Sequence, residues 1–101
     1  MITVAVMYPA GDAFDLSYYM QTHIPLVKRL WEGMGLQNIQ VLRGMPGPDG
    51  TGPVYSHLAL LTFQSMDSFK AAAGQHGGEI FADIPNFTQA KPNIQFSETV
   101  A

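Results

Sequence analysis

Few groups in this sequence could carry chemistry, and His23 is the most unusual of them. It lies in a stretch whose apolar residues recur at helical spacing. At about 100° per residue, it falls in the middle of the apolar face, which comprises Leu16, Tyr19, Met20, Leu26, Val27, Leu30, Trp31 and Met34. Burial would hold this imidazole neutral, which suits a general base. The structural alternative is a core histidine bonded to a backbone group that Pro25 leaves free.

Four more side chains could share a site with His23. Tyr8 and Tyr19 could orient an oxygenated substrate through their phenol groups, although such residues more often belong to the core. His57 shares a strand face with apolar residues, and could point into a pocket or into a seam between subunits. Asp83 could ionise beside the pocket, or it could hold the turn that follows it. Tyr18 falls on the polar side of the helix, so we expect it at the surface or in an interface.

The composition argues against a metal site and against several bound cofactors. The chain has three histidines and no cysteine, and no two histidines lie three or four residues apart. A zinc or iron site usually needs such spacing. No phosphate-binding glycine loop, dinucleotide fingerprint or nucleophile elbow occurs. We therefore expect no metal and no cofactor, and we expect His76, in a glycine-rich segment, to be exposed.

Length and charge limit the classes of partner. The chain has 101 residues, which is enough for one domain over residues 1–101. Its net charge is −3 with five Lys and Arg, which disfavours nucleic acid and anionic membranes as partners. We see no signal peptide and no apolar run of membrane-spanning length, so we expect a cytoplasmic protein. Only 13% of the residues are charged, about half the usual share, which favours self-association.

The hydrophobic pattern predicts the elements that must position these groups. Alternating apolar residues indicate four strands, at residues 1–8, 36–45, 54–63 and 93–100. Helical patterns cover residues 15–33, with a break around Pro25, and residues 65–73, with Ser65 as the cap of the second helix. A joint at residues 76–78 and a short helix at residues 79–84 should follow. The order β-α-β-β-α-β predicts an α+β, ferredoxin-like fold: a four-stranded antiparallel sheet with its helices on one face.

The first and third strands are apolar on both faces, so the second face of the sheet also needs a cover. The chain has no further segment to provide one. A second copy of the same sheet would do so, and we therefore expect a homodimer through the open sheet face, with a closed, barrel-like core.

Two segments resemble the signatures of a known family. The first combines Tyr8-Pro9, Phe14-Asp15, Tyr19 and His23-Ile24-Pro25-Leu26, and the second is Glu79-Ile80-Phe81-Ala82-Asp83-Ile84-Pro85-Asn86-Phe87-Thr88. Residues 92–98 are similar to the last strand of that family. Together they span nearly the whole chain and resemble the EthD family of dimeric α+β-barrel proteins.

The resemblance implies the ferredoxin-like fold and the homodimer. The family takes its name from a gene needed to degrade a fuel ether alongside a cytochrome P450 system. Similar small barrels include cofactor-free monooxygenases, polyketide cyclases and muconolactone-type isomerases. They tend to place a ligand between the sheet and the helices, where the inner face of the first helix, with His23, would look.

Two functions are compatible with these features. The first is a cofactor-independent isomerase, cyclase or monooxygenase in a degradation or secondary-metabolism pathway. It would act on a small, mostly apolar, oxygenated molecule, with His23 as general base and Tyr8 or Tyr19 stabilising an oxyanion. The second is a non-catalytic dimer that binds a hydrophobic metabolite or assists an oxygenase system, with His23 as a hydrogen-bonding anchor.

Overall fold

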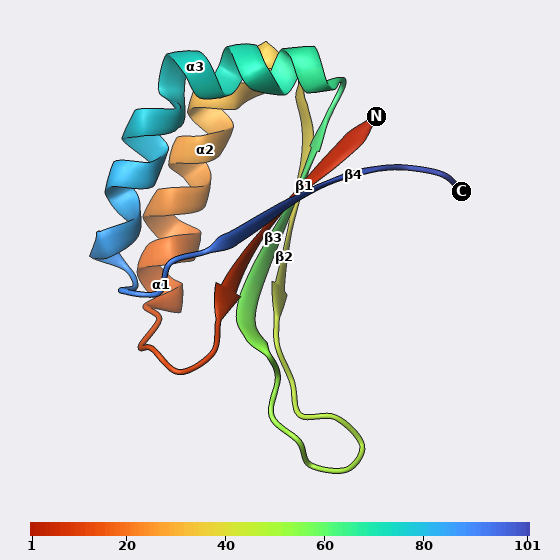
Figure 1. Ribbon diagram of the computed structural model, residues 1–101. Helices are drawn as coiled ribbons and strands as arrows, with labels where there is room; N and C mark the ends of the chain where they lie inside the picture. Colours follow the sequence, from red (N-terminus) through yellow and green to blue (C-terminus); the bar gives the residue numbers. More distant parts are fainter.

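One antiparallel sheet with helices on a single face makes up the chain, and the computed structural model describes residues 1–101 (Figure 1). The strands are β1 (Ile2–Pro9), β2 (Leu36–Arg43), β3 (Tyr55–Phe63) and β4 (Asn93–Glu98), in the order β2-β3-β1-β4. All three neighbouring pairs are antiparallel. This topology confirms the predicted ferredoxin-like α+β fold. The long connection between β2 and β3 projects beyond the sheet (Figure 1).

The first helical segment consists of four consecutive parts: α1 (Leu16–Tyr18), the π-helix η1 (Tyr19–His23), α2 (Ile24–Trp31) and the 3₁₀ turn η2 (Glu32–Met34). Asp15 caps its start by accepting a hydrogen bond from the Tyr18 amide at 3.0 Å. The Ile24 amide donates to the Tyr19 carbonyl, five residues back. Pro25 follows at once, and its ring would crowd the carbonyl of a regular helix. The predicted break therefore takes the form of a π turn.

The π turn changes which side chains face inward. In a regular helix, the positions three and four before His23 share its face, and these are Met20 and Tyr19. With one extra residue in the turn, Tyr19 and Tyr18 take those places. Met20 is accordingly 44% exposed and Tyr18 is half-buried. The predictions that Met20 belongs to the core and that Tyr18 lies on the polar side are therefore wrong.

The second helix, α3 (Met66–Asp83), is longer and more regular than expected. Ser65 caps it as predicted, with its Oγ accepting from the Ser68 amide at 3.0 Å. The predicted joint at residues 76–78 is wrong, because the helix continues through Gly74, Gly77 and Gly78. Glycine weakens a helix but keeps its backbone donor, so packing can hold the helix together.

His76 lies within α3, so its predicted exposure needs correction as well. It bonds Glu79 one turn later, with 3.2 Å between Nδ1 and Oε1, and its side chain is only 22% exposed.

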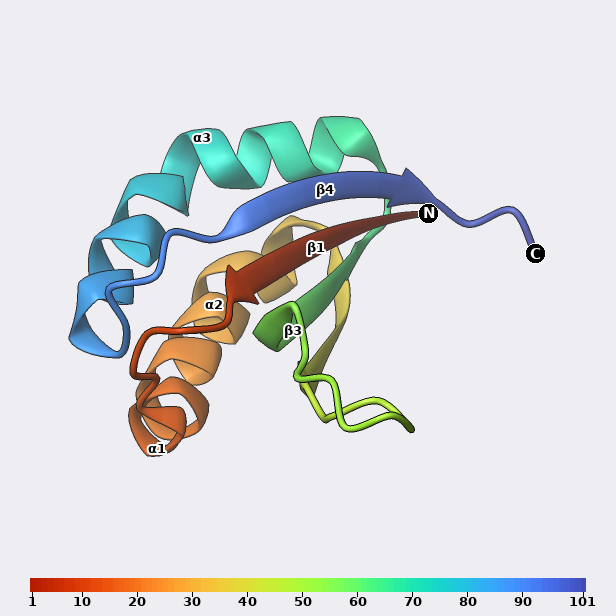
Figure 2. The same ribbon diagram turned by 60° about the horizontal axis from the view of Figure 1, so that its bottom comes forward.

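The hydrophobic core lies between the helices and one face of the sheet. Val4 and Tyr8 of β1 and Leu61 and Phe63 of β3 point into it, and alternate with residues on the opposite face. We call that opposite side the open face; its apolar residues are Ala5, Met7, Leu42, Leu58 and Leu60. Figure 2 shows β4 beside β1 at the edge of the sheet, with α3 on the helix side. None of the helices has both the length and the hydropathy to cross a bilayer.

Candidate functional site

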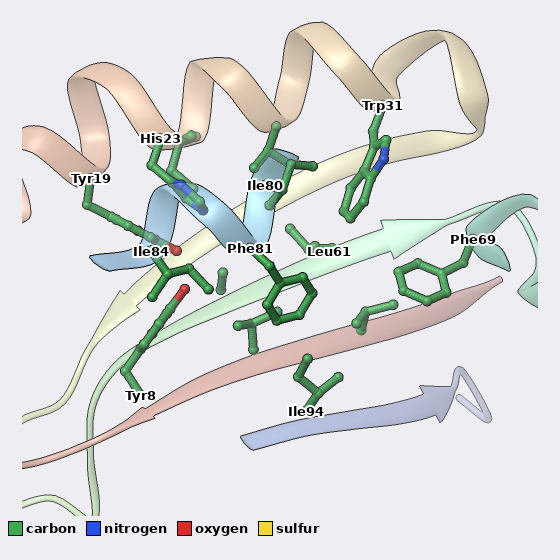
Figure 3. Close-up of a pocket in the computed structure, with 15 residues that line it drawn as sticks. Tyr8, Tyr19, His23, Trp31, Leu61, Phe69, Ile80, Phe81, Ile84 and Ile94 are labelled. Atoms are coloured by element: carbon green, nitrogen blue, oxygen red, sulfur yellow. The ribbon is translucent and has the colours of Figure 1, made fainter. Parts of the chain in front are cut away.

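A cavity of about 50 Å³ lies between the sheet and the two long helices. Residues of β1 and β3 form its floor, α2 and α3 cover it, and Ile94 of β4 closes one side (Figure 3). His23 is the single lining residue that is not hydrophobic by type. Phe81 and Ile94, which also line the cavity, are 50% and 39% exposed. The mouth of the cavity therefore lies between α3 and β4.

The polar groups of the cavity gather at one end. Tyr8 and Tyr19 are each 1% exposed, and Figure 3 shows their hydroxyl groups pointing toward one another. Neither hydroxyl bonds to another group of the chain, yet no fully enclosed side-chain polar atom lacks a partner. Both oxygens must therefore be open to the cavity. At the other end, the Trp31 indole donates to the Ala72 carbonyl at 2.9 Å, so its polar atom is satisfied.

Burial and the neighbouring aromatic rings shape the chemistry of these phenols. Loss of water raises the pKa of both Tyr8 and Tyr19, and the nearby Tyr8 raises that of Tyr19 further. Both therefore stay protonated and act as hydrogen-bond donors. Their ring centroids lie 6.0 Å apart in an edge-to-face arrangement, and Phe87 packs on both rings. The phenols are thus held rigidly at the end of the cavity.

The His23 ring is oriented by a carboxylate. Its Nδ1 lies 2.8 Å from Oδ2 of Asp83, and the ring stacks on Tyr19 with 5.4 Å between centroids. An ionised carboxylate only accepts, so Nδ1 must carry the proton. Nε2 then has a free lone pair. Burial lowers the pKa of His23, and the Asp83 carboxylate only partly offsets this effect, so the neutral imidazole is favoured.

Asp83 is held in turn by two donors on its other oxygen. The Tyr18 hydroxyl donates to Oδ1 at 2.6 Å, and the Asn86 amide donates to the same atom at 3.0 Å. The 3₁₀ turn η3 (Ile84–Asn86) at the end of α3 brings Asn86 back onto Asp83. Burial raises the pKa of the Asp83 carboxyl, but its three hydrogen-bond donors outweigh burial and lower it below its ordinary value. Asp83 is therefore ionised.

The structure brings together four of the five residues that the sequence singled out. His23, Tyr8 and Tyr19 line the cavity, and Asp83 lies behind His23. Asp83 combines both expected roles, because it also ties down the turn that contains Asn86. The backbone partner suggested for His23 is replaced by this carboxylate.

His57 lies elsewhere. It faces the helix side of the sheet, stacks on Phe14 with 3.9 Å between centroids, and does not line the cavity. Its Nδ1 is 3.1 Å from the Ser56 hydroxyl. It therefore points neither into the pocket nor into a seam on the open face, and the expectation that it binds substrate does not match its position. Burial lowers the pKa of His57, and Arg43 on the neighbouring strand lowers it further.

Sequence patterns missed three contributors to the site. Tyr18 was missed because the π turn adds one residue and so shifts the helical periodicity. The Phe87 ring packs against the His23 ring with 4.7 Å between centroids, and only the fold of the segment after α3 brings Phe87 there. Phe81 lies on the cavity side of a helix that the pattern predicted to be broken.

Comparison with solved structures identifies the relatives of this chain. An EthD-like protein from Ralstonia eutropha is 37% identical, with a TM-score of 0.91 over 99% of this chain and 92% of the other. An EthD family protein from Bacillus halodurans is 17% identical, with a TM-score of 0.71 over 99% of both chains. SnoaB, a cofactor-independent oxygenase from Streptomyces nogalater, is 13% identical, with a TM-score of 0.67 over 99% of this chain and 92% of SnoaB.

The last two similarities concern the fold alone, because their identities are low. No protein-family model matches the chain, and no curated protein matches it. The similarity to the Ralstonia eutropha protein extends to the sequence, because more than a third of the residues are identical over nearly the full length of both chains. This chain belongs to the EthD family.

Proposed function

We propose that this protein is a cofactor-independent enzyme that binds a small, neutral, oxygenated molecule in the cavity and removes a proton from it. One observation carries the proposal. Three polar atoms without a partner in the chain converge at one end of an otherwise apolar cavity: the hydroxyls of Tyr8 and Tyr19 and Nε2 of His23. Ligand sites typically combine apolar walls with a few polar groups that converge on the ligand, and this end of the cavity has that arrangement.

The three atoms suit a carbonyl or phenol that can lose a proton. Tyr8 and Tyr19 would donate to its oxygen and stabilise the enolate or phenolate as negative charge develops. Nε2 of His23 would accept the proton, and the Asp83 carboxylate would stabilise the imidazolium that forms. No lysine or arginine lines the cavity, which favours a neutral ligand over an anion. Isomerisation, cyclisation and oxygenation of an activated phenol can each begin with this step.

The cavity is smaller than most ligand sites, so a ligand can enter only if a side chain moves. Ligand sites usually measure roughly 300–1,000 Å³, whereas this cavity measures about 50 Å³. A ligand must therefore displace a side chain, and Phe81 is the candidate because it is half exposed at the mouth. The fold-level similarity to SnoaB, a cofactor-independent oxygenase, supports proton abstraction without a bound cofactor.

We also propose that the protein works as a homodimer through the open face. Ala5, Met7, Leu58 and Leu60 lie on the two central strands of that face. The resemblance to the EthD family described above implies a homodimer. Pairing of two open faces would remove this apolar surface from water without obstructing the cavity on the opposite side of the sheet.

The test uses 2-tetralone, a neutral aromatic ketone with acidic protons beside its carbonyl. Trp31 is the sole tryptophan and lines the cavity, so its fluorescence reports occupancy. Exchange of the acidic protons in D₂O, followed by NMR, reports proton abstraction. Replacement His23→Gln should slow exchange about 100-fold or more, the usual contribution of a general base. His76→Gln is the matched control, because His76 lies outside the cavity and should leave the rate unchanged.

The two measurements separate the proposal from its alternatives. Binding with exchange that depends on His23 supports an enzyme. Binding without catalysed exchange contradicts the enzyme and supports a non-catalytic ligand carrier or accessory protein. If neither 2-tetralone nor a panel of phenols and lactones changes the fluorescence of Trp31, the cavity is not a ligand site.

A further inference from the structure

Tyr18 occupies an unusual position for a residue outside the cavity. Its hydroxyl makes the shortest side-chain hydrogen bond around the site, at 2.6 Å to Oδ1 of Asp83. The Asn86 amide contacts both members of this pair, at 3.3 Å from the Tyr18 hydroxyl and 3.0 Å from Oδ1. The Tyr18 ring also stacks near Phe87, with 6.3 Å between centroids. This arrangement exists because the π turn carries Tyr18 to the inner side of the helix.

Asp83 needs such support, because it is the last residue of α3 and its side chain is 13% exposed. A carboxylate in contact with water can rotate away from an imidazole and be solvated instead. Tyr18 and Asn86 both bind Oδ1, which leaves Oδ2 directed at Nδ1 of His23. Tyr18 and Asn86 therefore fix one carboxylate oxygen of Asp83, while the other oxygen accepts from His23.

We propose that Tyr18 is a positioning residue that acts through Asp83, holding its carboxylate against Nδ1 of His23 so that Nε2 stays free toward the cavity. The inference rests on the proposed function, in which Nε2 is the base. It gives the π turn a role, since a regular helix would present Met20 in place of Tyr18. Packing alone would be served as well by phenylalanine, so the hydroxyl is the group at issue.

The titratable groups around His23 are few. Asp83 approaches from α3, Tyr18 and Tyr19 from the first helical segment, and Tyr8 from β1. The three phenols stay neutral near pH 7, because the pKa of each is raised. Asp83 is therefore the one charged neighbour whose position can change the protonation of His23.

The test measures the tautomer of His23 directly and needs no ligand. Long-range ¹H–¹⁵N NMR spectra of ¹⁵N-labelled protein, recorded between about pH 5 and pH 8, distinguish protonation at Nδ1 from protonation at Nε2 and follow the titration. In the unaltered protein, neutral His23 should carry its proton on Nδ1. In Tyr18→Phe, the ratio of Nδ1–H to Nε2–H should fall about fivefold, the effect of losing one hydrogen bond of ordinary strength. The pKa of His23 should fall as well, because burial is then less well compensated.

Two further variants make the outcome decisive. Tyr55→Phe removes a phenol that accepts a single hydrogen bond from Asn93 at 3.3 Å and lies outside the cavity, so it should change nothing. Asp83→Asn removes the charged partner and should change the tautomer most. If Asp83→Asn shifts the tautomer and Tyr18→Phe leaves ratio and pKa as they were, the role of Tyr18 is refuted and the proposed function survives. If neither variant has an effect, the orientation of His23 that the proposed function requires fails too.

Discussion

The phenol groups of Tyr8 and Tyr19 are poorly explained by folding alone. Neither hydroxyl bonds to another group of the chain, so neither adds a hydrogen bond to the stability of the fold. Phenylalanine would provide the same ring contacts with Phe87. Polar groups that face a cavity and have no partner in the fold are typical of binding sites.

Removal of either hydroxyl should therefore have opposite effects on stability and on binding. In Tyr8→Phe and Tyr19→Phe, the melting temperature should stay equal or rise, whereas affinity for 2-tetralone should fall about fivefold. Thermal unfolding and Trp31 fluorescence measure the two quantities, with Tyr55→Phe as a control outside the cavity. A clear loss of stability with unchanged affinity would mean that the hydroxyls serve the fold.

The histidines make stability depend on pH. Burial lowers the pKa of His23 and of His57, so the folded protein takes up protons less readily than the unfolded chain, whose histidines titrate near pH 6.5. The free energy of unfolding should therefore fall between about pH 7 and pH 5. Asp83, with a pKa below 3.8, stays ionised throughout this window.

Urea unfolding at these two pH values measures the effect. In His23→Gln one titrating group is lost, so the difference between the two free energies should shrink. Equal stability of the unaltered protein at both values would contradict the pKa directions that burial imposes.

At the scale of elements, the continuity of α3 has a direct consequence. Gly74 and Gly78 are exposed, and a Cβ built on either would meet no atom within 4 Å. Each lies inside a helix, where alanine is favoured over glycine by roughly 1 kcal/mol. Gly74→Ala and Gly78→Ala should each raise the free energy of unfolding by roughly 0.5–1 kcal/mol. Chemical denaturation tests this, and lower stability in both variants would favour the broken helix that the sequence pattern suggested.

In the proposed function, Phe81 of α3 controls the entry of a ligand, because it lines the cavity and is half exposed at the mouth. Phe81→Ala would widen the mouth and remove the ring that a ligand has to displace, so 2-tetralone should associate faster. Phe81→Trp should slow association by filling the mouth. Stopped-flow measurement of Trp31 fluorescence gives the rate for Phe81→Ala, and NMR line shapes of the ligand serve for Phe81→Trp, which adds a second indole. Identical rates in both variants would place the way in elsewhere.

For the whole molecule, the decisive question is what covers the open face. Leu60 lies directly between Ala5 and Gln40 on neighbouring strands, near the middle of that face. In the proposed dimer, Leu60→Lys would bury an unpaired charge and should shift the protein to monomer. Sedimentation or light scattering measures the mass. Val54→Lys is the matched control, because Val54 is 77% exposed before the third strand; dimerisation that survives Leu60→Lys would exclude this face.

Much of the architecture could be predicted from local patterns. Strand alternation, the Ser65 cap and the β-α-β-β-α-β order each depend on neighbours in the chain, which is why the fold was predicted correctly. The apolar environment of His23 followed from helical periodicity in the same way.

Other features depend on contacts between distant segments. Asp83 and His23 are 60 residues apart, and only the docking of α3 against the first helical segment brings them to 2.8 Å. The sequence showed that Pro25 disturbs the helix, but not that the disturbance would be a π turn, because the extra residue is stabilised by packing of Tyr18 and Tyr19. For His57, the local pattern predicted the correct strand face, but it did not predict that the Phe14 ring would stack on the imidazole.

The order of elements, the face on which His23 lies and the scarcity of charge all follow from local pattern and composition. Contacts between distant segments set which residues meet: the free phenols at one end of the cavity, the carboxylate behind His23 and the tyrosine behind the carboxylate. The reason is physical. Periodicity states which way a side chain points, whereas its partner depends on how helices dock on the sheet, and that docking is a property of the whole packed core.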